Sequence, residues 1–111
     1  MGLIAFYEGV DGTQNIVQTV EDIPGQNFHP VRNEAIRSAK LYGVRAGCRI
    51  DICQSPEGSE RETFCIVQVK RGSPEYIVNT FEKSYEDEYA IVSYIRIGGE
   101  LDGNVGRIKI S

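Results

Sequence analysis

Short runs of apolar and β-branched residues with a period of two recur along almost the whole chain. A period of two places successive side chains on opposite faces of a strand and does not fit the 3.6-residue turn of a helix. In the segment 89–97, one face would carry Tyr89, Ile91, Ser93, Ile95 and Ile97, and the other Ala90, Val92, Tyr94 and Arg96. The pattern predicts an all-β fold with eight strands, near 2–8, 15–20, 36–42, 47–54, 63–70, 76–83, 88–97 and 104–110.

Turn-forming residues separate these runs, as at Asp11-Gly12, Gly72-Ser73-Pro74 and Gly98-Gly99. One segment is ambiguous, because 33–43 has an N-cap asparagine, good helix formers and a terminal glycine. We expect a strand from about Ile36 instead, since helix propensity is weak and tertiary context overrides it. The segment 21–32 is expected to be a long loop.

Two pairs of segments indicate an internal duplication. Residues 6–12 and 52–58 both run from an apolar strand through turn residues and an acid to a glycine. Residues 33–38 and 102–107 each pass from a polar turn into a strand. The 111 residues are therefore expected to form one domain of two motifs, the first at about 3–43 and the second at about 48–110.

The repeated pattern resembles the βγ-crystallin family, whose motifs carry N/D-N/D-x-x-S/T-S and open with an aromatic-rich strand and a hairpin glycine. Tyr7 and Gly12 fit this opening, whereas Cys53 stands where the second motif would have an aromatic residue. The resemblance covers nearly the whole chain. It implies two four-stranded Greek-key motifs packed as a sandwich.

The resemblance also implies calcium sites at the two polar turns. The candidate ligands are Asn33 and Glu34 in the first motif and Asp102 and Gly103 in the second. Neither motif has a hydroxyl at the fifth position, which is Arg37 in the first and Gly106 in the second. Calcium requires six to eight oxygen ligands, so we expect weak or lost binding. Either the turns serve the fold, with Arg37 pairing with Glu34 or binding carbonyls, or a weak site persists at Asp102.

The composition limits partners and compartment. The formal net charge of −4 argues against nucleic acid as a partner, because a negatively charged protein repels the phosphate backbone. We expect no membrane span and no signal peptide, since the sequence has neither a long apolar run nor a basic start followed by one. Three cysteines favour a reducing, cytoplasmic setting, with secretion as the alternative if a signal peptide is missing. Alternation places Cys48 and Cys65 inside and Cys53 at the surface.

No sequence motif of a known catalytic type is present, and His29 is the single histidine. The carboxylates at Glu82, Glu86, Asp87 and Glu88 are interpreted as a solvated loop. We therefore expect a non-enzymatic structural or binding module, with a protein or a second copy of the chain as an open partner. The alternatives are a secreted inhibitor or toxin-like effector using loop 21–32 or 84–88, and a carbohydrate-binding module. The sugar would stack on tyrosines from the set Tyr76, Tyr85, Tyr89 and Tyr94.

Overall fold

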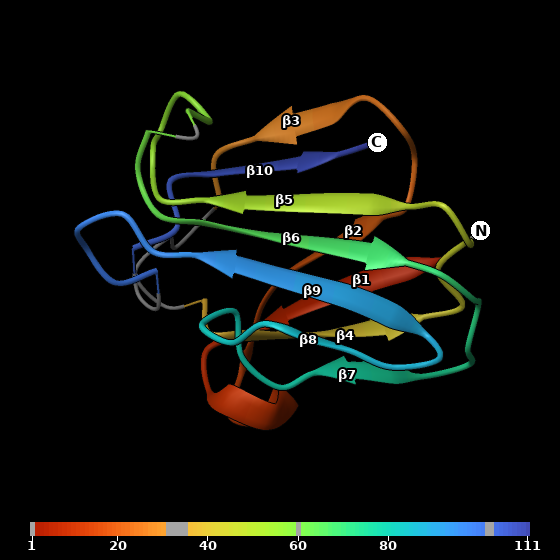
Figure 1. Ribbon diagram of the computed structural model, residues 1–111. Coiled ribbons are helices and arrows are strands. Elements are labelled where there is room, and N and C mark those ends of the chain that lie inside the picture. Colours follow the sequence, from red (N-terminus) through yellow and green to blue (C-terminus); the bar gives the residue numbers. More distant parts are fainter. Residues whose placement is uncertain (1, 31–35, 60, 102–103) are drawn as a thin grey trace.

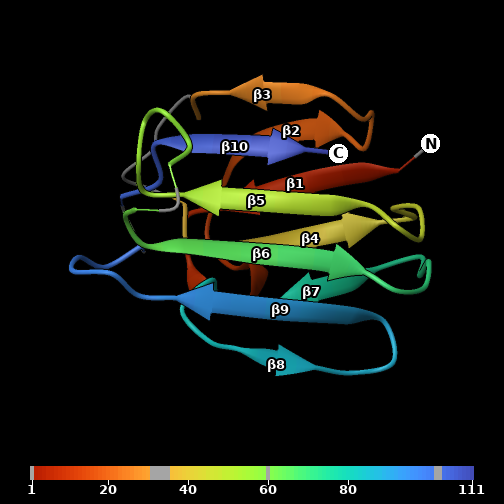
Figure 2. The same cartoon turned by 45° about the horizontal axis from the view of Figure 1, so that its top comes forward.

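Two antiparallel β-sheets pack face to face in the computed structural model, which describes residues 2–30, 36–59, 61–101 and 104–111 (Figures 1 and 2). Sheet A has four strands in the order β2-β1-β4-β7, and sheet B has six in the order β3-β10-β5-β6-β9-β8. The strands are β1 (Leu3–Tyr7), β2 (Ile16–Glu21), β3 (Gln26–Phe28), β4 (Ser38–Tyr42), β5 (Arg49–Cys53), β6 (Phe64–Val69), β7 (Tyr76–Val78), β8 (Tyr85–Glu86), β9 (Ala90–Ile95) and β10 (Arg107–Ile110). A short 3-10 turn, η1 (Val10–Gly12), follows β1. The predicted all-β class is confirmed.

A strand forms in each of the eight predicted ranges, with β2 running one residue past the range 15–20, and two further strands were not predicted. β3 lies inside the expected loop 21–32, and β8 forms the start of a hairpin with β9. β3 has three residues and β8 has two, so neither is long enough to show an alternating pattern in the sequence. They are recognisable only from their pairing, of β3 with β10 and of β8 with β9. The ambiguous segment forms strand β4, because Ala39 and Leu41 both face the core while β4 pairs with β1.

The two halves of the chain follow the same strand path. In each half, the first strand lies between the second and the last, as β1 lies between β2 and β4 and β5 between β6 and β10. The third strand of each half crosses to the opposite sheet, so that β3 pairs with β10 and β7 pairs with β4 (Figure 1). The β8–β9 hairpin is an addition in the second half and extends sheet B beyond β6.

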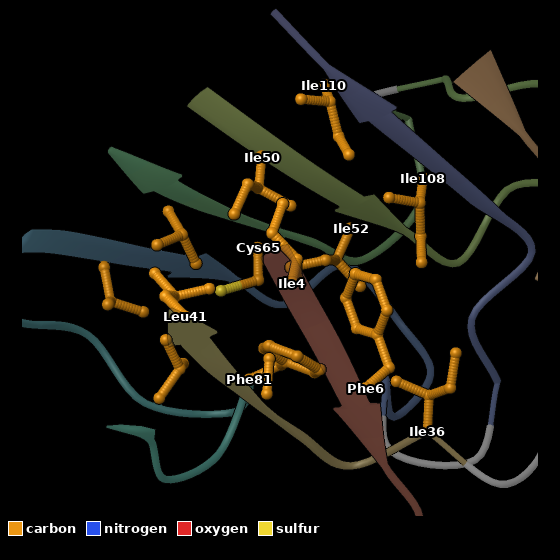
Figure 3. Close-up of a cluster of buried hydrophobic side chains, with 14 of the residues drawn as sticks. Ile4, Phe6, Ile36, Leu41, Ile50, Ile52, Cys65, Phe81, Ile108 and Ile110 are labelled. Carbon is orange, nitrogen blue, oxygen red and sulfur yellow. The ribbon is translucent and has the colours of Figure 1, made fainter. Parts of the chain in front are cut away.

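The core lies between the sheets and draws on both halves of the chain. Figure 3 shows members of this core that come from both halves of the chain: Ile4, Phe6, Ile36, Leu41, Ile50, Ile52, Cys65, Phe81, Ile108 and Ile110. The predicted burial of Ile50, Ile52, Cys65 and Val67 is confirmed. Cys48 is also buried, as predicted.

The prediction that Cys53 is a surface residue is wrong, since its side chain is only 2% exposed. Cys53 and Cys65 do occupy opposite faces of sheet B, because Cys53 pairs with Phe64 and Cys65 with Ile52. The segment after β5 folds back over the outer face, where Lys109, which pairs with Asp51 on that face, donates from Nζ to the Gly58 carbonyl at 3.0 Å. Alternation identified the face on which Cys53 lies but not the chain that covers it.

Asp22 is a buried carboxylate that ties the end of β2 to two other segments. Its Oδ1 accepts a hydrogen bond from Gly2 N–H at 3.0 Å, and its Oδ2 accepts one from Arg45 N–H at 2.9 Å. Desolvation by burial acts to raise the pKa of Asp22, but the N–H groups of Arg45 and Gly2 and the charge of Arg45 outweigh it. The pKa of Asp22 therefore lies below its ordinary value of 3.8.

Because the folded-state pKa of Asp22 is lowered, ionised Asp22 stabilises the fold at pH values above 3.8. That contribution is lost as the pH falls through the lower folded-state pKa. We expect Asp22→Asn to lower the free energy of unfolding at pH 7 by about 1–3 kcal/mol and to flatten the acid branch of its pH dependence. Denaturant melts of both proteins between pH 7 and pH 2 test this. Parallel acid branches would show that another group causes the acid sensitivity.

Candidate functional site

The four predicted calcium ligands, Asn33, Glu34, Asp102 and Gly103, lie outside the described residues. The structure does describe the residues that follow each turn, Ile36–Ser38 and Asn104–Arg107, together with the hairpins against which they pack. These neighbours define what occupies the fifth and sixth positions of each motif.

In the first motif, the fifth position holds Arg37 against the hairpin that follows β1. Its backbone N–H donates to the Tyr7 carbonyl at 2.9 Å, and its Nη1 donates to the Glu8 carbonyl at 3.2 Å. Of the two roles predicted for Arg37, carbonyl binding is observed, while pairing with Glu34 involves a residue outside the described ranges. A positive charge therefore lies where the family pattern has a hydroxyl.

Ser38, at the sixth position, is fully buried and fastens the same hairpin to β4. Its hydroxyl accepts a hydrogen bond from Gly12 N–H at 2.9 Å and donates one to the Gly9 carbonyl. Gly12 has a φ of +65°, which glycine adopts without strain. The aliphatic part of the Lys40 side chain occupies the space that a Cβ atom of Gly12 would need. Lys40 Nζ then lies 5.2 Å from the centre of the Tyr7 ring. Sequence reasoning missed this role, although the motif's final serine was the available signal.

The second motif builds an equivalent arrangement from different residues. Arg107, at its sixth position, donates from Nε to the Pro56 carbonyl at 2.9 Å and from Nη1 to Asn27 Oδ1 at 2.8 Å. Lys109 Nζ donates to the carbonyl of Gly58 at 3.0 Å, and Gly58 has a φ of +74°. In both motifs, a guanidinium group thus binds a backbone carbonyl of the hairpin.

Gly106, at the fifth position of the second motif, has no room for a side chain. A Cβ atom there would lie 2.5 Å from the Gln54 carbonyl oxygen and 2.8 Å from Pro56 N. Both contacts are with backbone atoms, which cannot move aside as a flexible side chain can. A hydroxyl-bearing residue at this position is therefore incompatible with the observed hairpin.

His29 joins the exchanged strand β3 to the second motif. Its Nδ1 lies 2.8 Å from the Gly106 carbonyl oxygen, and its Nε2 lies 2.8 Å from Arg107 Nη2. A guanidinium group only donates hydrogen bonds, so this geometry assigns Nε2 as acceptor and places the proton on Nδ1. Both ring nitrogens are thus engaged in holding β3 against β10.

The acidic residues around the β8–β9 turn make separate contacts and do not converge. Glu86 pairs with Lys70 at 2.8 Å, and Glu88 lies 3.6 Å from Arg71. Asp87 accepts a hydrogen bond from the Tyr76 hydroxyl at 2.6 Å. The fourth predicted carboxylate, Glu82, accepts one from Leu101 N–H at 2.9 Å.

Three of the four predicted sugar-stacking tyrosines gather near the β7–β8 side of the sandwich. The rings of Tyr76 and Tyr89 lie 5.9 Å apart, and the Arg71 guanidinium lies 5.9 Å from the Tyr89 ring. Tyr76 and Tyr85 also pack against the core, as does Tyr94 from β9. Desolvation and the hydrogen bond to Asp87 raise the pKa of Tyr76. These rings are therefore in contact with other protein groups, which leaves less of each ring free to stack on a sugar.

Within the described ranges, no three His, Cys, Asp or Glu side chains come together as a metal-ligand set. In the same part of the chain, no helix is long and apolar enough to cross a membrane. The chemistry that the described turns offer is carbonyl binding by guanidinium groups and fastening of the two hairpins. Comparisons with models of protein families, with curated proteins and with solved structures each gave no match to this chain.

Proposed function

We propose that this chain is a βγ-crystallin-like structural or binding module in which calcium binding is weak or lost. The observation that carries the proposal is the repeated strand path, in which each half sends its third strand to the other sheet. In each half, the last strand returns to lie beside the first, as in a Greek key. The strand path supports the resemblance independently, because the resemblance rests on sequence motifs and the path is a property of the fold.

The contacts of the two arginines support weak calcium binding. Arg37 and Arg107 each place a guanidinium group on a hairpin carbonyl beside a candidate turn. A calcium ion bound at that turn would be repelled by the neighbouring positive charge. In the second motif, a hydroxyl-bearing side chain cannot replace Gly106, because backbone atoms of Gln54 and Pro56 occupy the space that its Cβ would need. The turns are therefore proposed to serve mainly to hold the hairpins.

Calcium titration by calorimetry, combined with thermal melts, tests this function. An ion that binds only the folded protein raises its stability by RT ln(1 + [L]/Kd), so even binding with a millimolar Kd is detectable at millimolar calcium. We expect no saturable heat at micromolar calcium and at most a small rise in Tm at several millimolar. Saturation with a Kd of about 10⁻⁵ M or tighter, typical of calcium sensors, would refute weak binding.

Arg37→Ser is expected to create or strengthen calcium binding in the first motif. The change restores a hydroxyl at the fifth position and removes a positive charge. Arg37→Met is the matched control, because it removes the charge without adding an oxygen. Calorimetry of both folded variants separates the two effects. If the calcium isotherm of Arg37→Ser equals that of the wild type, the fifth-position residue does not control binding.

A further inference from the structure

An open pocket lies between the turn η1 and the segment that follows β7. Its volume is about 340 Å³, and it is lined by Asp11, Asn79, Thr80, Lys83 and Tyr85. This volume is at the lower end of the range for sites that bind small molecules. Figure 1 shows η1 beside the segment that leaves β7, at the lower left of the molecule. The pocket is separate from both candidate calcium turns.

Asp11 and Asn79 form one side of the pocket and are held together by two hydrogen bonds. Asp11 N–H donates to the Asn79 carbonyl at 2.8 Å, and Asn79 Nδ2 donates to Asp11 Oδ1 at 2.6 Å. Asp11 has a φ of +59°, a left-handed conformation that aspartate tolerates better than most residues. No described residue donates to the other carboxylate oxygen, Oδ2. That oxygen and the second Nδ2 hydrogen of Asn79 therefore offer a ligand an acceptor and a donor side by side.

The opposite side of the pocket belongs to the segment that leads into β8, and this segment is anchored at three places. Phe81 is fully buried in the core. Thr80 Oγ1 accepts a hydrogen bond from Glu82 N–H at 3.1 Å. Ser84 Oγ accepts one from Tyr94 N–H at 2.8 Å and donates one to the Tyr94 carbonyl at 3.3 Å. A rim that is already fixed in this way loses less conformational entropy when a ligand binds.

The charges that line the pocket favour a neutral ligand. The described lining residues include one carboxylate, of Asp11, and one ammonium group, of Lys83, and neither forms an ion pair with a described residue. A ligand with a single charge would be attracted by one of these groups and repelled by the other. The charges of the pocket therefore balance each other and do not select an ion.

The uncharged groups of the pocket favour a ligand with several hydroxyls. A hydroxyl group both donates and accepts hydrogen bonds, so adjacent hydroxyls can bind Asp11 Oδ2, Asn79 Nδ2 and the hydroxyl of Thr80 together. A bond to the ionised carboxylate of Asp11 is stronger than one to a neutral acceptor. Tyr85 packs against the core and presents an apolar surface to the C–H groups of such a ligand.

We propose that this pocket binds a neutral saccharide through adjacent hydroxyl groups. Asp11 accepts a hydrogen bond from the sugar, and Asn79, Thr80 and Lys83 donate to its oxygens. The inference rests on the proposed role of the chain as a binding module and names the class of ligand. It does not depend on calcium, so a failure to bind sugar and a failure of the calcium proposal are separate results.

Titration of ¹⁵N-labelled protein with glucose, galactose, mannose and N-acetylglucosamine, each to about 50 mM, tests the proposal by amide chemical shifts. We expect at least one sugar to give saturable shifts at Asp11, Asn79 and Thr80, with a Kd of roughly 1–10 mM. Because the ligand is uncharged, this Kd should change less than about twofold between about 0.05 M and 0.5 M salt. Glycine and acetate are the zwitterionic and anionic probes, and we expect neither to saturate.

Asp11→Asn is expected to raise the sugar Kd at least about tenfold, because an amide replaces the ionised acceptor. Asparagine also tolerates the left-handed conformation, so the turn is kept. Glu57→Gln is the matched control, since exposed Glu57 precedes a glycine in the repeated segment 52–58 and lies outside the pocket. Thermal melts show whether each variant is folded.

Three results would overturn the proposal. The first is a set of shifts that stay linear for all four sugars, or that saturate only at residues away from the pocket. The second is saturable binding of glycine or acetate without binding of any sugar, which would show that the ligand class is wrong. The third is an equal effect of Asp11→Asn and Glu57→Gln, which would show that Asp11 does not contact the sugar.

Discussion

Phe6→Ala is expected to lower the free energy of unfolding by about 3–5 kcal/mol, because it removes a ring from the centre of the sandwich. Phe6 is fully buried, and its ring lies 6.5 Å from that of Phe81, which comes from the segment after β7 (Figure 3). The truncation thus leaves a cavity between the two halves of the chain. Urea denaturation with matched m-values measures the loss.

Leu3→Ala is the control for this substitution, since Leu3 belongs to the same strand but faces outward and is 40% exposed. We expect it to cost less than about 1 kcal/mol. Similar losses for the two variants would contradict the assignment of the inner and outer faces of β1.

Gly106→Ala is expected to destabilise the protein by about 3 kcal/mol or more, although it adds a single methyl group. The added Cβ would overlap the backbone of Gln54 and Pro56, so the hairpin must shift. Such a shift also breaks the hydrogen bond from Gly106 N–H to the Cys53 carbonyl. Thermal and urea melts of the variant provide the measurement.

Gly72→Ala is the matched control, because the nearest atom to its added Cβ lies at an ordinary 3.6 Å. We expect this change to alter stability by less than about 1 kcal/mol, and it can be stabilising through the unfolded state. If Gly106→Ala is equally mild, the hairpin is not packed on Gly106 as observed.

Alternation in the sequence predicted which residues face the core, because side chains on a strand must point to opposite sides. It correctly placed Ile50, Ile52 and Cys65 in the core. For β4, the internal repeat favoured a strand over a helix. Alternation could not predict the burial of Cys53, which depends on a hairpin folding over the outer face. Burial by another segment of the chain is a tertiary effect, and it produces no periodic pattern in the sequence.

The candidate site was predictable only in part. The motif pattern indicated that Arg37 could bind carbonyls, and this contact is observed at Glu8. It did not reveal that Ser38 fastens the first hairpin or that His29 bridges to Gly106 and Arg107. The His29 contact joins residues that are 77 and 78 positions apart in the sequence, and only the fold brings them together.

The exchange of third strands has a consequence for how the chain folds during synthesis. Sheet A lacks one of its edge strands until β7 has been made, and β3 cannot pair until β10, the last of the described strands, has been made. A nascent chain that stops after β4 thus holds an unpaired β3 and an incomplete sheet. Long-range pairings of this kind slow folding and leave strand edges exposed meanwhile. A cut between the two halves should yield fragments that reassemble with each other and do not persist as separate stable domains.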